Sequence, residues 1–548
     1  MEESRRPKAA GSIPNRNGGF AEPNILAGGT SAGVMRAPFL SLVCLVVLST
    51  PLPAQQPTAA DSARHLLNRL AFGPRPGEVE QIAREGALHA ADRMLSDSRP
   101  DDQALPALEE KFHLERFQAR AMLETEEKLR RQRREAKADS EMTGAGARAT
   151  GAPRLLPEYQ ELTVVRAVMA RDQLREVMVD FWANHFNVFF NKGADRALLP
   201  TYIETVIRPH ALGRFEDLLL ATARSPAMLF YLDNVRSVAA QDSRLGGGEP
   251  ARPGRPTGLN ENYARELMEL HTLGVDGGYT QHDVTEVARI LTGWSMTRPA
   301  DGAEFVFRER AHDYGAKTVL GVRFPAGHGE DEGERLLRML ARHPATLHHI
   351  SRKLCARFVA DDPPDGCVDA AVHAWEASDG DILAVLRAIV HSPEFWAPRA
   401  MDNKVKSPLE FIASAARATD ATPDTLPGLA QAVARLGQPL FQQASPAGYP
   451  ERQEDWVNSG ALLGRMNTGV ALAAGRIAGS APDLDALAPA SADYGALLDA
   501  IDHQLFAGSM SARTRAAVTN ELNEIPNPEA ARTFAIGLAL GSPEFQRQ

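Results

Sequence analysis

The densest group of potentially reactive side chains lies in residues 260–294, which begin NENYARELMELH. Asn262, Glu266 and Glu269 follow one another at positions i, i+4 and i+7, so on an α-helix they share one face. Two carboxylates one turn apart suit a hard divalent cation, or an acid–base pair whose pKa values are split by mutual repulsion. With His271 close by, the pattern predicts a polar pocket in which Glu266 and Glu269 are catalytic or metal-binding residues.

A second segment, FWANHFNV, supplies Asn184 and His185 among aromatic residues. The spacing H-E-x-x-H of zinc proteases is absent, so a metal site would have to combine His185 with Glu266 and Glu269 from the first segment. Two alternatives remain open. Arginines such as Arg265 could neutralise the carboxylates and fix helix packing, and His185 could be a hydrogen-bonded core residue.

A third candidate is the pair His312–Asp313, which precedes Lys317 in a connection between two short strand-like segments. Functional residues favour such loops, and an aspartate can orient an imidazole for general base catalysis. The alternative is an Asx-turn with a histidine on the surface.

The elements that would position these residues are mostly helical by their apolar spacing. Strand signals are limited to 304–308 and 317–324, which we expect to pair as one small β-hairpin. Gly274, Gly277 and Gly278 are expected at positive φ, and Thr280 is expected to cap the following helix together with Asp283. The predicted fold class is therefore mostly α, a large multi-helix body with one small β-hairpin.

Four segments define the predicted organisation around one large helical domain at residues 55–548. Residues 1–34 read as a disordered leader or a mis-assigned start, and 35–54 as a signal peptide cleaved after Ala54. Residues 104–156 read as a charged helical arm with a linker, and 244–258 as a Gly/Pro loop. The apolar run within 35–54 is too short to span a bilayer. We therefore expect export to the periplasm or the extracellular space, with no stable transmembrane span after cleavage.

The charge composition bears on which partners the protein can bind. Charged residues make up 24% of the 548 residues and the formal net charge is −10, which disfavours binding to nucleic acid. After cleavage two cysteines remain, Cys355 and Cys367, on either side of the loop ADDPPDG. They could form one disulfide or stay as two buried thiols.

Several long motifs in order resemble one bacterial family. They are FWANHFNV, the 260–294 block, HDYGAKTVLG, KLCARFVADDPP and LALGSPEF. From about His65 to the C-terminus the chain resembles the family described as domain of unknown function 1800. The resemblance implies a large, mostly helical, exported or periplasmic protein, and it implies no activity, so no catalytic residues carry over.

These observations lead to two hypotheses. The first is an exported enzyme, such as a hydrolase assisted by a divalent metal, that acts on an envelope or extracellular substrate through the 182–187 and 260–271 helices. The second is a non-catalytic helical scaffold or binding protein of the cell envelope with a protein partner, in which the same polar groups fix the packing.

Overall fold

Several helices start at a side chain that accepts a hydrogen bond from the first turn. In the described part of the chain, three begin with a reciprocal capping box, in which the cap and the third residue of the helix bind each other's backbone N–H. The pairs are Thr58 with Asp61, Thr280 with Asp283, and Ser407 with Glu410. The predicted cap at Thr280 is thus confirmed.

The computed structural model describes residues 56–96, 104–143, 155–239, 258–298, 301–491 and 493–548. They belong to a compact unit, Gln55–Gln548, whereas the second unit, Met1–Ala54, lies outside the described residues. The expectations for 1–34 and 35–54 therefore concern residues that the structure does not describe, as do those for 144–154 and 244–257. The proposed division into a leader, a signal peptide and one domain stays a prediction.

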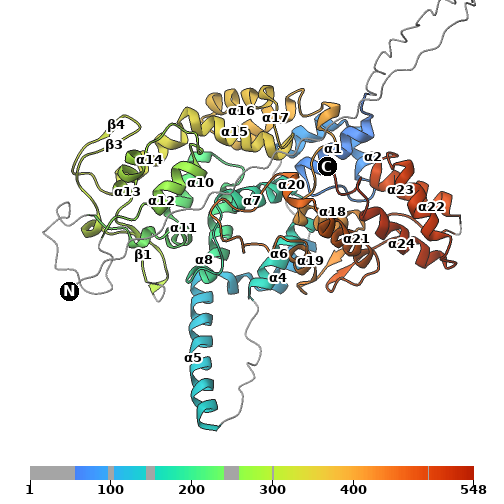
Figure 1. Ribbon diagram of the computed structural model, residues 1–548, viewed down its shortest axis with the longest axis horizontal. Helices are drawn as coiled ribbons and strands as arrows, with labels where there is room; N and C mark the ends of the chain where they lie inside the picture. The colour runs from blue at the N-terminus through green and yellow to red at the C-terminus, as the bar shows by residue number, and fades with distance from the viewer. Residues whose placement is uncertain (1–55, 97–103, 144–154, 240–257, 299–300, 492) are drawn as a thin grey trace, which may run out of the picture. The chain divides into compact units, whose positions relative to one another are not determined.

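The described chain is mostly α-helical, which confirms the predicted fold class (Figure 1). The first half contains α1 (Ala59–Leu70), α2 (Glu78–Glu85), α3 (Ala87–Met94), α4 (Ala104–Phe112), η1 (Leu114–Phe117), α5 (Ala119–Thr143), α6 (Leu155–Met169), α7 (Gln173–His185), α8 (Asp195–Tyr202), η2 (Ile203–Ile207), α9 (Arg208–His210), α10 (Phe215–Arg224), α11 (Pro226–Tyr231), η3 (Asn234–Arg236), α12 (Asn262–Glu266), η5 (Leu267–His271) and α13 (Gln281–Ile290). The second half contains η7 (Glu309–Ala311), α14 (Glu330–Ala341), α15 (Pro344–Phe358), α16 (Asp365–Ser378), α17 (Ile382–His391), η8 (Pro398–Ala400), α18 (Pro408–Ala418), α19 (Gly428–Arg435), α20 (Gln453–Trp456), α21 (Ser459–Ala473), α22 (Tyr494–Phe506), α23 (Ala512–Leu522) and α24 (Pro528–Leu540).

The helices bury one continuous apolar cluster that runs from α1 to the segment after α24. Its largest enclosed side chains include Trp182 on α7, Tyr263 on α12 and Trp294 in β1. Neighbours in sequence often pack together, as α15, α16 and α17 do, and α21 lies along α24 (Figure 1). Among the described helices, none combines the length and the apolar character that crossing a bilayer requires.

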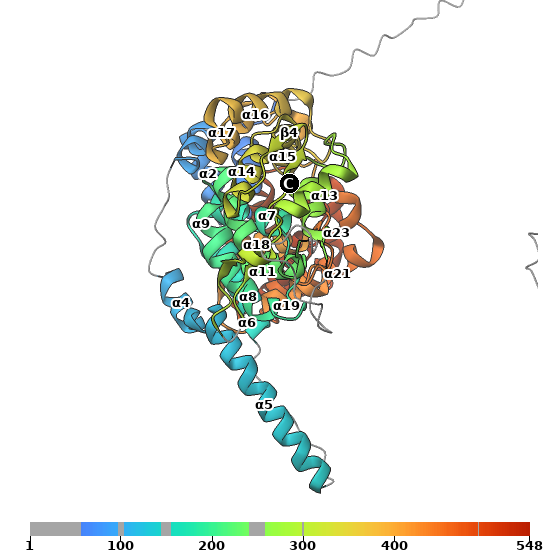
Figure 2. The same cartoon turned by 90° about the vertical axis from the view of Figure 1, so that its left-hand side faces the viewer.

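Helix α5 is the charged part of the predicted arm. It contacts α8 and η1 near its first turns and projects away from them in both views (Figures 1 and 2). Exposed pairs four residues apart, Arg120–Glu124 at 3.2 Å and Arg131–Glu135 at 2.9 Å, follow its surface. Such pairs contribute only about 0.3–0.5 kcal/mol each, so α5 depends on its packed end for its position.

The predicted hairpin is wrong in its pairing, although both segments contain strands. β2 (Phe305–Phe307) pairs with β1 (Trp294–Met296), and β3 (Lys317–Val319) turns directly back into β4 (Val322–Phe324). Leu320 and Gly321 between β3 and β4 both have positive φ, 50° and 76°, which is the two-residue turn that matches strand twist. A third short pair joins β5 (Thr422–Pro423) to β6 (Ser480–Ala481).

The glycines before α13 follow the prediction in part. Gly274 and Gly278 have φ of 85° and 79°, whereas Gly277 does not have a positive φ. Gly277 instead allows a close approach, since a Cβ there would lie 2.4 Å from the Cβ of Leu273.

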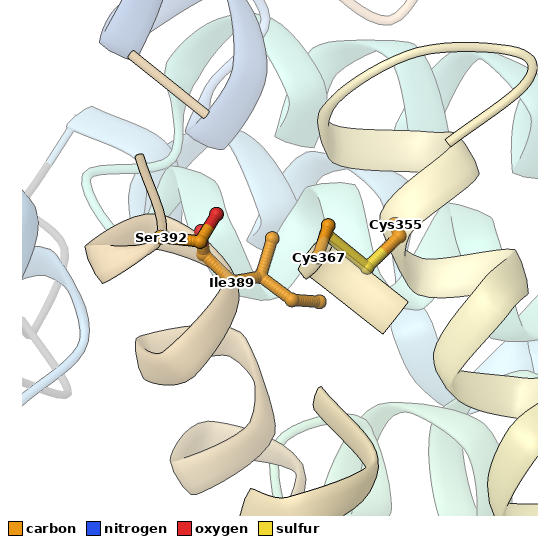
Figure 3. Close-up of a disulfide and its surroundings, with 4 residues drawn as sticks. All are labelled: Cys355, Cys367, Ile389 and Ser392. Atoms are coloured by element: carbon orange, nitrogen blue, oxygen red, sulfur yellow. A yellow bond between two sulfur atoms is a disulfide. The ribbon is translucent and has the colours of Figure 1, made fainter. Parts of the chain in front are cut away.

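Cys355 on α15 and Cys367 on α16 form a disulfide, which resolves the alternative that the sequence left open. Figure 3 shows the bond between the two helices, with Ile389 of α17 and the adjacent Ser392 beside it. Both cysteines are fully buried. The disulfide therefore ties two packed helices together across the 359–364 connection.

Removing this disulfide should destabilise the fold. Breaking a cross-link that closes a loop of this size is expected to lower the protein's free energy of unfolding by about 3 kcal/mol, because the unfolded chain gains conformational freedom. Urea unfolding of the wild type, with and without reductant, and of the Cys355→Ala/Cys367→Ala double variant would measure the loss. Equal midpoints for oxidised wild type and double variant would contradict a structural role.

Candidate functional site

Helix α7 presents two chemically different faces. Met178, Trp182 and His185 are buried in the apolar core, whereas Asp180 and Asn184, one turn apart, line a small cleft together with Phe181. Asp172 caps the helix by accepting a hydrogen bond from the Arg175 backbone N–H.

The cleft lies where six parts of the chain meet. Its volume is about 60 Å³, which has room for a few water molecules or one small polar group. Besides α7, its walls come from α15, from the segment before α18, from α18 itself, from Gln438 after α19 and from the 449–456 segment. The polar lining residues are Asp180, Asn184, Arg357, Lys404, Ser407, Glu410, Gln438, Tyr449 and Glu451.

The cations of the cleft are already paired. Arg357 Nη1 lies 2.6 Å from Glu410 Oε1, and Lys404 forms an ion pair with Asp361. Although burial acts to raise the pKa of Glu410, Arg357 and the Ser407 N–H outweigh it and lower that pKa to about 2. Burial lowers the pKa of Lys404, partly opposed by Asp361.

Asp180 differs from these groups because its carboxyl forms no hydrogen bond or ion pair within the described part of the chain. Burial raises its pKa from 3.8 to about 7, the nearby Arg357 opposes the shift, and Glu410 and Glu451 add to it. A carboxyl group with such a pKa can both donate and accept a proton near neutral pH. A perturbed acid in an open cleft is a typical mark of a functional site.

Asn184 belongs to the same cleft as a positioning residue. Its Nδ2 donates to Tyr449 O at 2.9 Å, and its Oδ1 accepts from Tyr449 N at 2.7 Å. Both ends of the amide are thereby occupied. Asn184 therefore holds the 449–456 wall in place.

His185 points away from the cleft, into the core. Its ring is parallel to Phe181 and its Nε2 lies 3.3 Å from His271 O. Burial lowers the pKa of His185 well below its usual value and, with the nearby Lys353, lowers that of His271 to about 3. Both rings are 2% exposed or less, so the two histidines are neutral core residues rather than accessible bases.

Glu266 and Glu269 lie on a helix whose geometry changes between them. The α-helical turn α12 passes into a π turn, η5, which contains Glu269 and His271. A π turn inserts an extra residue and rotates the following side chains, so the expected single face with Asn262 is interrupted. Asn262 donates to Leu232 O at 3.2 Å instead. Burial, and then the adjacent Glu269, raise the pKa of Glu266.

The residues proposed as a metal site do not assemble. Across the described ranges, no group of three or more His, Cys, Asp or Glu residues is arranged to hold a metal ion. The geometry therefore gives no support to His185, Glu266 and Glu269 as a ligand set for a divalent metal.

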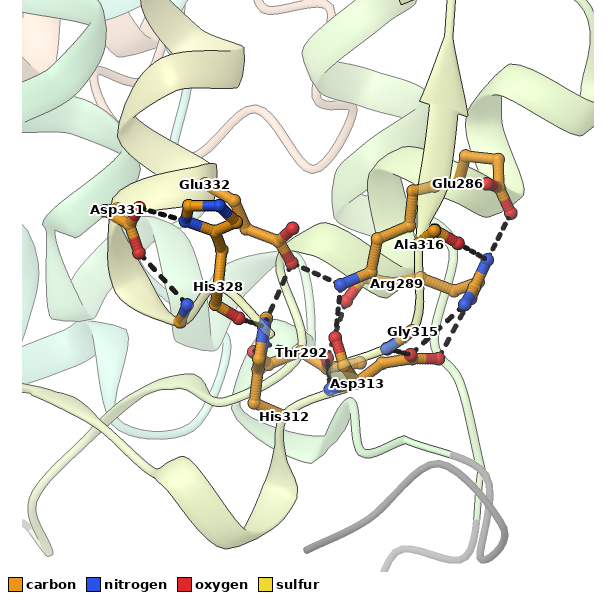
Figure 4. A network of polar contacts seen from close by, with 12 residues as sticks. Glu286, Arg289, Thr292, His312, Asp313, Gly315, Ala316, His328, Asp331 and Glu332 are labelled. Carbon is orange, nitrogen blue, oxygen red and sulfur yellow. Dashed lines mark hydrogen bonds and ion pairs between the residues drawn. The ribbon is translucent and has the colours of Figure 1, made fainter. Parts of the chain in front are cut away.

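His312 and Asp313 lie in a buried polar network rather than in a catalytic pair (Figure 4). The Asp313 carboxylate accepts two hydrogen bonds from the Arg289 guanidinium, from Nε at 2.9 Å and from Nη2 at 3.1 Å. The carboxylate beside His312 is that of Glu332, with Oε1 2.9 Å from Nε2. The expectation that Asp313 orients His312 is therefore wrong, because Arg289 occupies Asp313.

The alternative for His312 and Asp313, an Asx-turn with a histidine on the surface, is confirmed for the turn and wrong for the histidine. Asp313 Oδ1 accepts from Gly315 N at 2.9 Å, which is an Asx-turn. His312, however, is fully buried, and both of its ring nitrogens face oxygens, Nδ1 that of Thr292 O at 2.6 Å. Lys317, also buried, forms an ion pair with Glu332 and donates to Asp313 O. The network joins the 313–317 connection to α14.

Glu332 should be essential to stability. The Glu332→Gln substitution leaves the buried Lys317 without its counter-charge, so we expect a loss of about 3–5 kcal/mol in urea unfolding. Asp331→Asn is the matched control, because its partner His328 is exposed and the loss should stay below about 1 kcal/mol. Equal losses would contradict the buried network.

The sequence interpretation missed most of the cleft. Asp180 lies four residues before Asn184, a spacing that could have identified it. Arg357, Lys404 and Glu410 come from segments far along the chain and carry no signal that links them to α7.

Comparisons with known proteins give a family and nothing finer. No curated protein and no solved structure matches the chain. The family model described as protein of unknown function (DUF1800) matches residues 65–547. Since the match covers nearly the whole chain, this protein belongs to the DUF1800 family.

Proposed function

We propose that this protein is an exported enzyme of the hydrolase type whose reaction centre is the cleft around Asp180. The observation that carries the proposal is the carboxyl of Asp180, which has no partner in the described residues and faces an open hollow lined by charged groups.

The chemistry follows from the protonation of Asp180. With a pKa of about 7, the group is present in both forms near neutral pH. The carboxylate takes a proton from a water molecule that attacks the substrate, and the acid form returns that proton to the leaving group. Arg357 and Lys404 line the same cleft, each paired with a carboxylate.

The size of the hollow restricts what can enter. A volume of about 60 Å³ is far below the 300–1,000 Å³ that encloses a whole small molecule. The reacting bond would therefore lie at an exposed end or side group of a larger envelope or extracellular substrate.

Export rests on two supports. Residues 35–54 have the charge, apolar run and small residues of a signal peptide. The disulfide between Cys355 and Cys367 suits an oxidising compartment, because thiols stay reduced in the cytosol. We therefore propose that the protein is exported to the periplasm or the extracellular space.

The proposed centre differs from the one suggested by sequence. It keeps helix α7 and Asn184, but moves the reacting group from His185, Glu266 and Glu269 to Asp180. No step of the proposed reaction passes through a metal ion.

A scaffold or binding protein remains the second candidate function. The observation in its favour is that His185, His271 and the His312–Glu332 network are enclosed and serve packing. If Asp180 is structural too, its removal will change stability and nothing else.

The first prediction from this proposal concerns activity. Purified wild-type protein should hydrolyse at least one of p-nitrophenyl acetate, phosphate or β-glucoside, with a rate that changes around pH 7. Asp180→Asn should lower that rate by about 10²–10⁴-fold, the usual contribution of a general acid–base group. Absorbance at the nitrophenolate band measures the turnover.

Asp369→Asn is the control, because Asp369 is exposed on α16 and does not line the cleft. It should leave the rate unchanged. Turnover by Asp180→Asn at the wild-type rate would refute the role of Asp180.

The second prediction concerns stability and pH. An acid whose folded pKa is raised binds a proton more tightly when folded, so stability falls as pH rises from about 4 to 7. Asp180→Asn removes this contribution. Its unfolding free energy relative to wild type should therefore increase with pH across that window, by at most about 1.4 kcal/mol per pH unit, and stay level above it.

Urea unfolding at pH 4, 5.5, 7 and 8.5 would measure the difference between the two proteins, in which other titrating groups cancel. Asp369→Asn should show no such trend. A difference that is independent of pH would show that Asp180 titrates normally.

A further inference from the structure

A second hollow lies where several helices end, at the C-terminal ends of α1, α6 and α18 and the start of α7. Its volume is about 440 Å³, within the 300–1,000 Å³ typical of sites for small molecules. It shares no lining residue with the Asp180 cleft.

Cationic side chains outnumber anionic ones in the lining of this hollow. Four guanidinium groups line it, those of Arg75, Arg93, Arg171 and Arg417, against the carboxylates of Glu78 and Asp172. The chain as a whole carries a formal charge of −10. A concave positive region on an acidic protein concentrates anions locally.

Two of these arginines are held rigidly by backbone carbonyls. Arg417 donates from Nε to Gly73 O at 2.7 Å and from Nη1 to Val168 O at 3.1 Å. Arg75 donates from Nη2 to the same Val168 O at 2.8 Å. Their guanidinium groups are thus fixed before any ligand arrives, which lowers the entropic cost of binding.

Three of the guanidinium groups already have a carboxylate partner. Arg75 pairs with Asp420, Arg93 with Glu85 at 2.8 Å, and Arg417 Nη2 lies 3.1 Å from Glu78 Oε2. Of these carboxylates, only that of Glu78 lines the hollow. Asp172 is turned to Arg175, with Oδ2 3.0 Å from its Nε. A guanidinium has five N–H donors, so pairing with one carboxylate leaves donors for another acceptor.

We infer that this hollow, the arginine cleft, binds a small organic anion that carries carboxylate or phosphate groups. Planar guanidinium groups bind both kinds of group through paired hydrogen bonds. The absence of aromatic residues among those that line the arginine cleft argues against a ligand recognised by ring stacking. This site would operate independently of the reaction proposed for Asp180.

Titration calorimetry on the purified protein at low salt tests the inference, with citrate and inorganic pyrophosphate as the two probes. We expect saturable binding of at least one probe, weakened by added sodium chloride because the attraction is electrostatic. Binding of citrate alone would identify a carboxylate ligand, and binding of pyrophosphate alone a phosphate ligand. Failure of both to bind at millimolar concentration would overturn the proposal.

Two variants locate the binding. Arg171→Gln removes one cation of the lining, and Gln81→Glu adds a carboxylate to it at an exposed position on α2. Each should weaken binding about tenfold or more, as expected when a charged hydrogen bond is lost or opposed. Neither variant removes Arg75 or Arg417, which hold the helix ends.

Matched controls make the same charge changes elsewhere. Arg196→Gln and Gln431→Glu alter exposed residues outside the arginine cleft and should leave the affinity within about twofold. Wild-type affinity in both Arg171→Gln and Gln81→Glu would place the anion elsewhere and overturn the proposal.

Discussion

Burial of Asp180 beside the ion pair between Arg357 and Glu410 sets the electrostatics of the candidate reaction centre. Arg357 is the cation nearest in effect to Asp180, and it would hold an isolated neighbouring carboxyl in its ionised form. Glu410 takes that cation at 2.6 Å and stays ionised with a pKa of about 2. Burial raises the pKa of Asp180 to about 7, Arg357 opposes that shift, and Glu410 and Glu451 add to it. Two carboxyl groups in one cleft thus titrate in different pH ranges, and such a separation of pKa values is what acid–base catalysis uses.

Helix α7 converts that electrostatic arrangement into an accessible site. Its apolar face anchors the helix through Trp182, whose Nε1 donates to Ala211 O at 3.0 Å. The opposite face carries Asp180 and Asn184, and Asn184 fixes the facing wall through two hydrogen bonds with the Tyr449 backbone. The rigidity of the core on one side therefore determines the shape of the cleft on the other.

Local signals in the sequence predicted local structure well. The capping box at Thr280 and Asp283 and the mostly helical class follow from residue type and spacing within a few positions. The regular helix face expected for Asn262, Glu266 and Glu269 is interrupted where the helix passes into a π turn at Leu267, which no propensity rule indicates. Glu269 still lies close enough to Glu266 to raise its pKa. The hairpin failed because Leu320–Gly321 makes a tight turn without the usual Asn-Gly, so β2 was left to pair with β1.

The cleft itself depends on contacts between residues more than two hundred positions apart, such as Asn184 with Tyr449, and periodicity cannot report these. One local feature of the sequence, the capping box of α18, does contribute a residue to the cleft. Glu410 closes the capping box of α18 through Oε2, which accepts from Ser407 N at 2.7 Å, and it binds Arg357 through Oε1. The same carboxylate that starts the helix therefore also neutralises the cation beside Asp180. Asp283 acts similarly, since it caps α13 and accepts from Leu320 N at 2.7 Å. A carboxylate that caps a helix with one oxygen can bind another group with its second oxygen. At Glu410 the second oxygen pairs with Arg357 and so offsets a positive charge in the cleft.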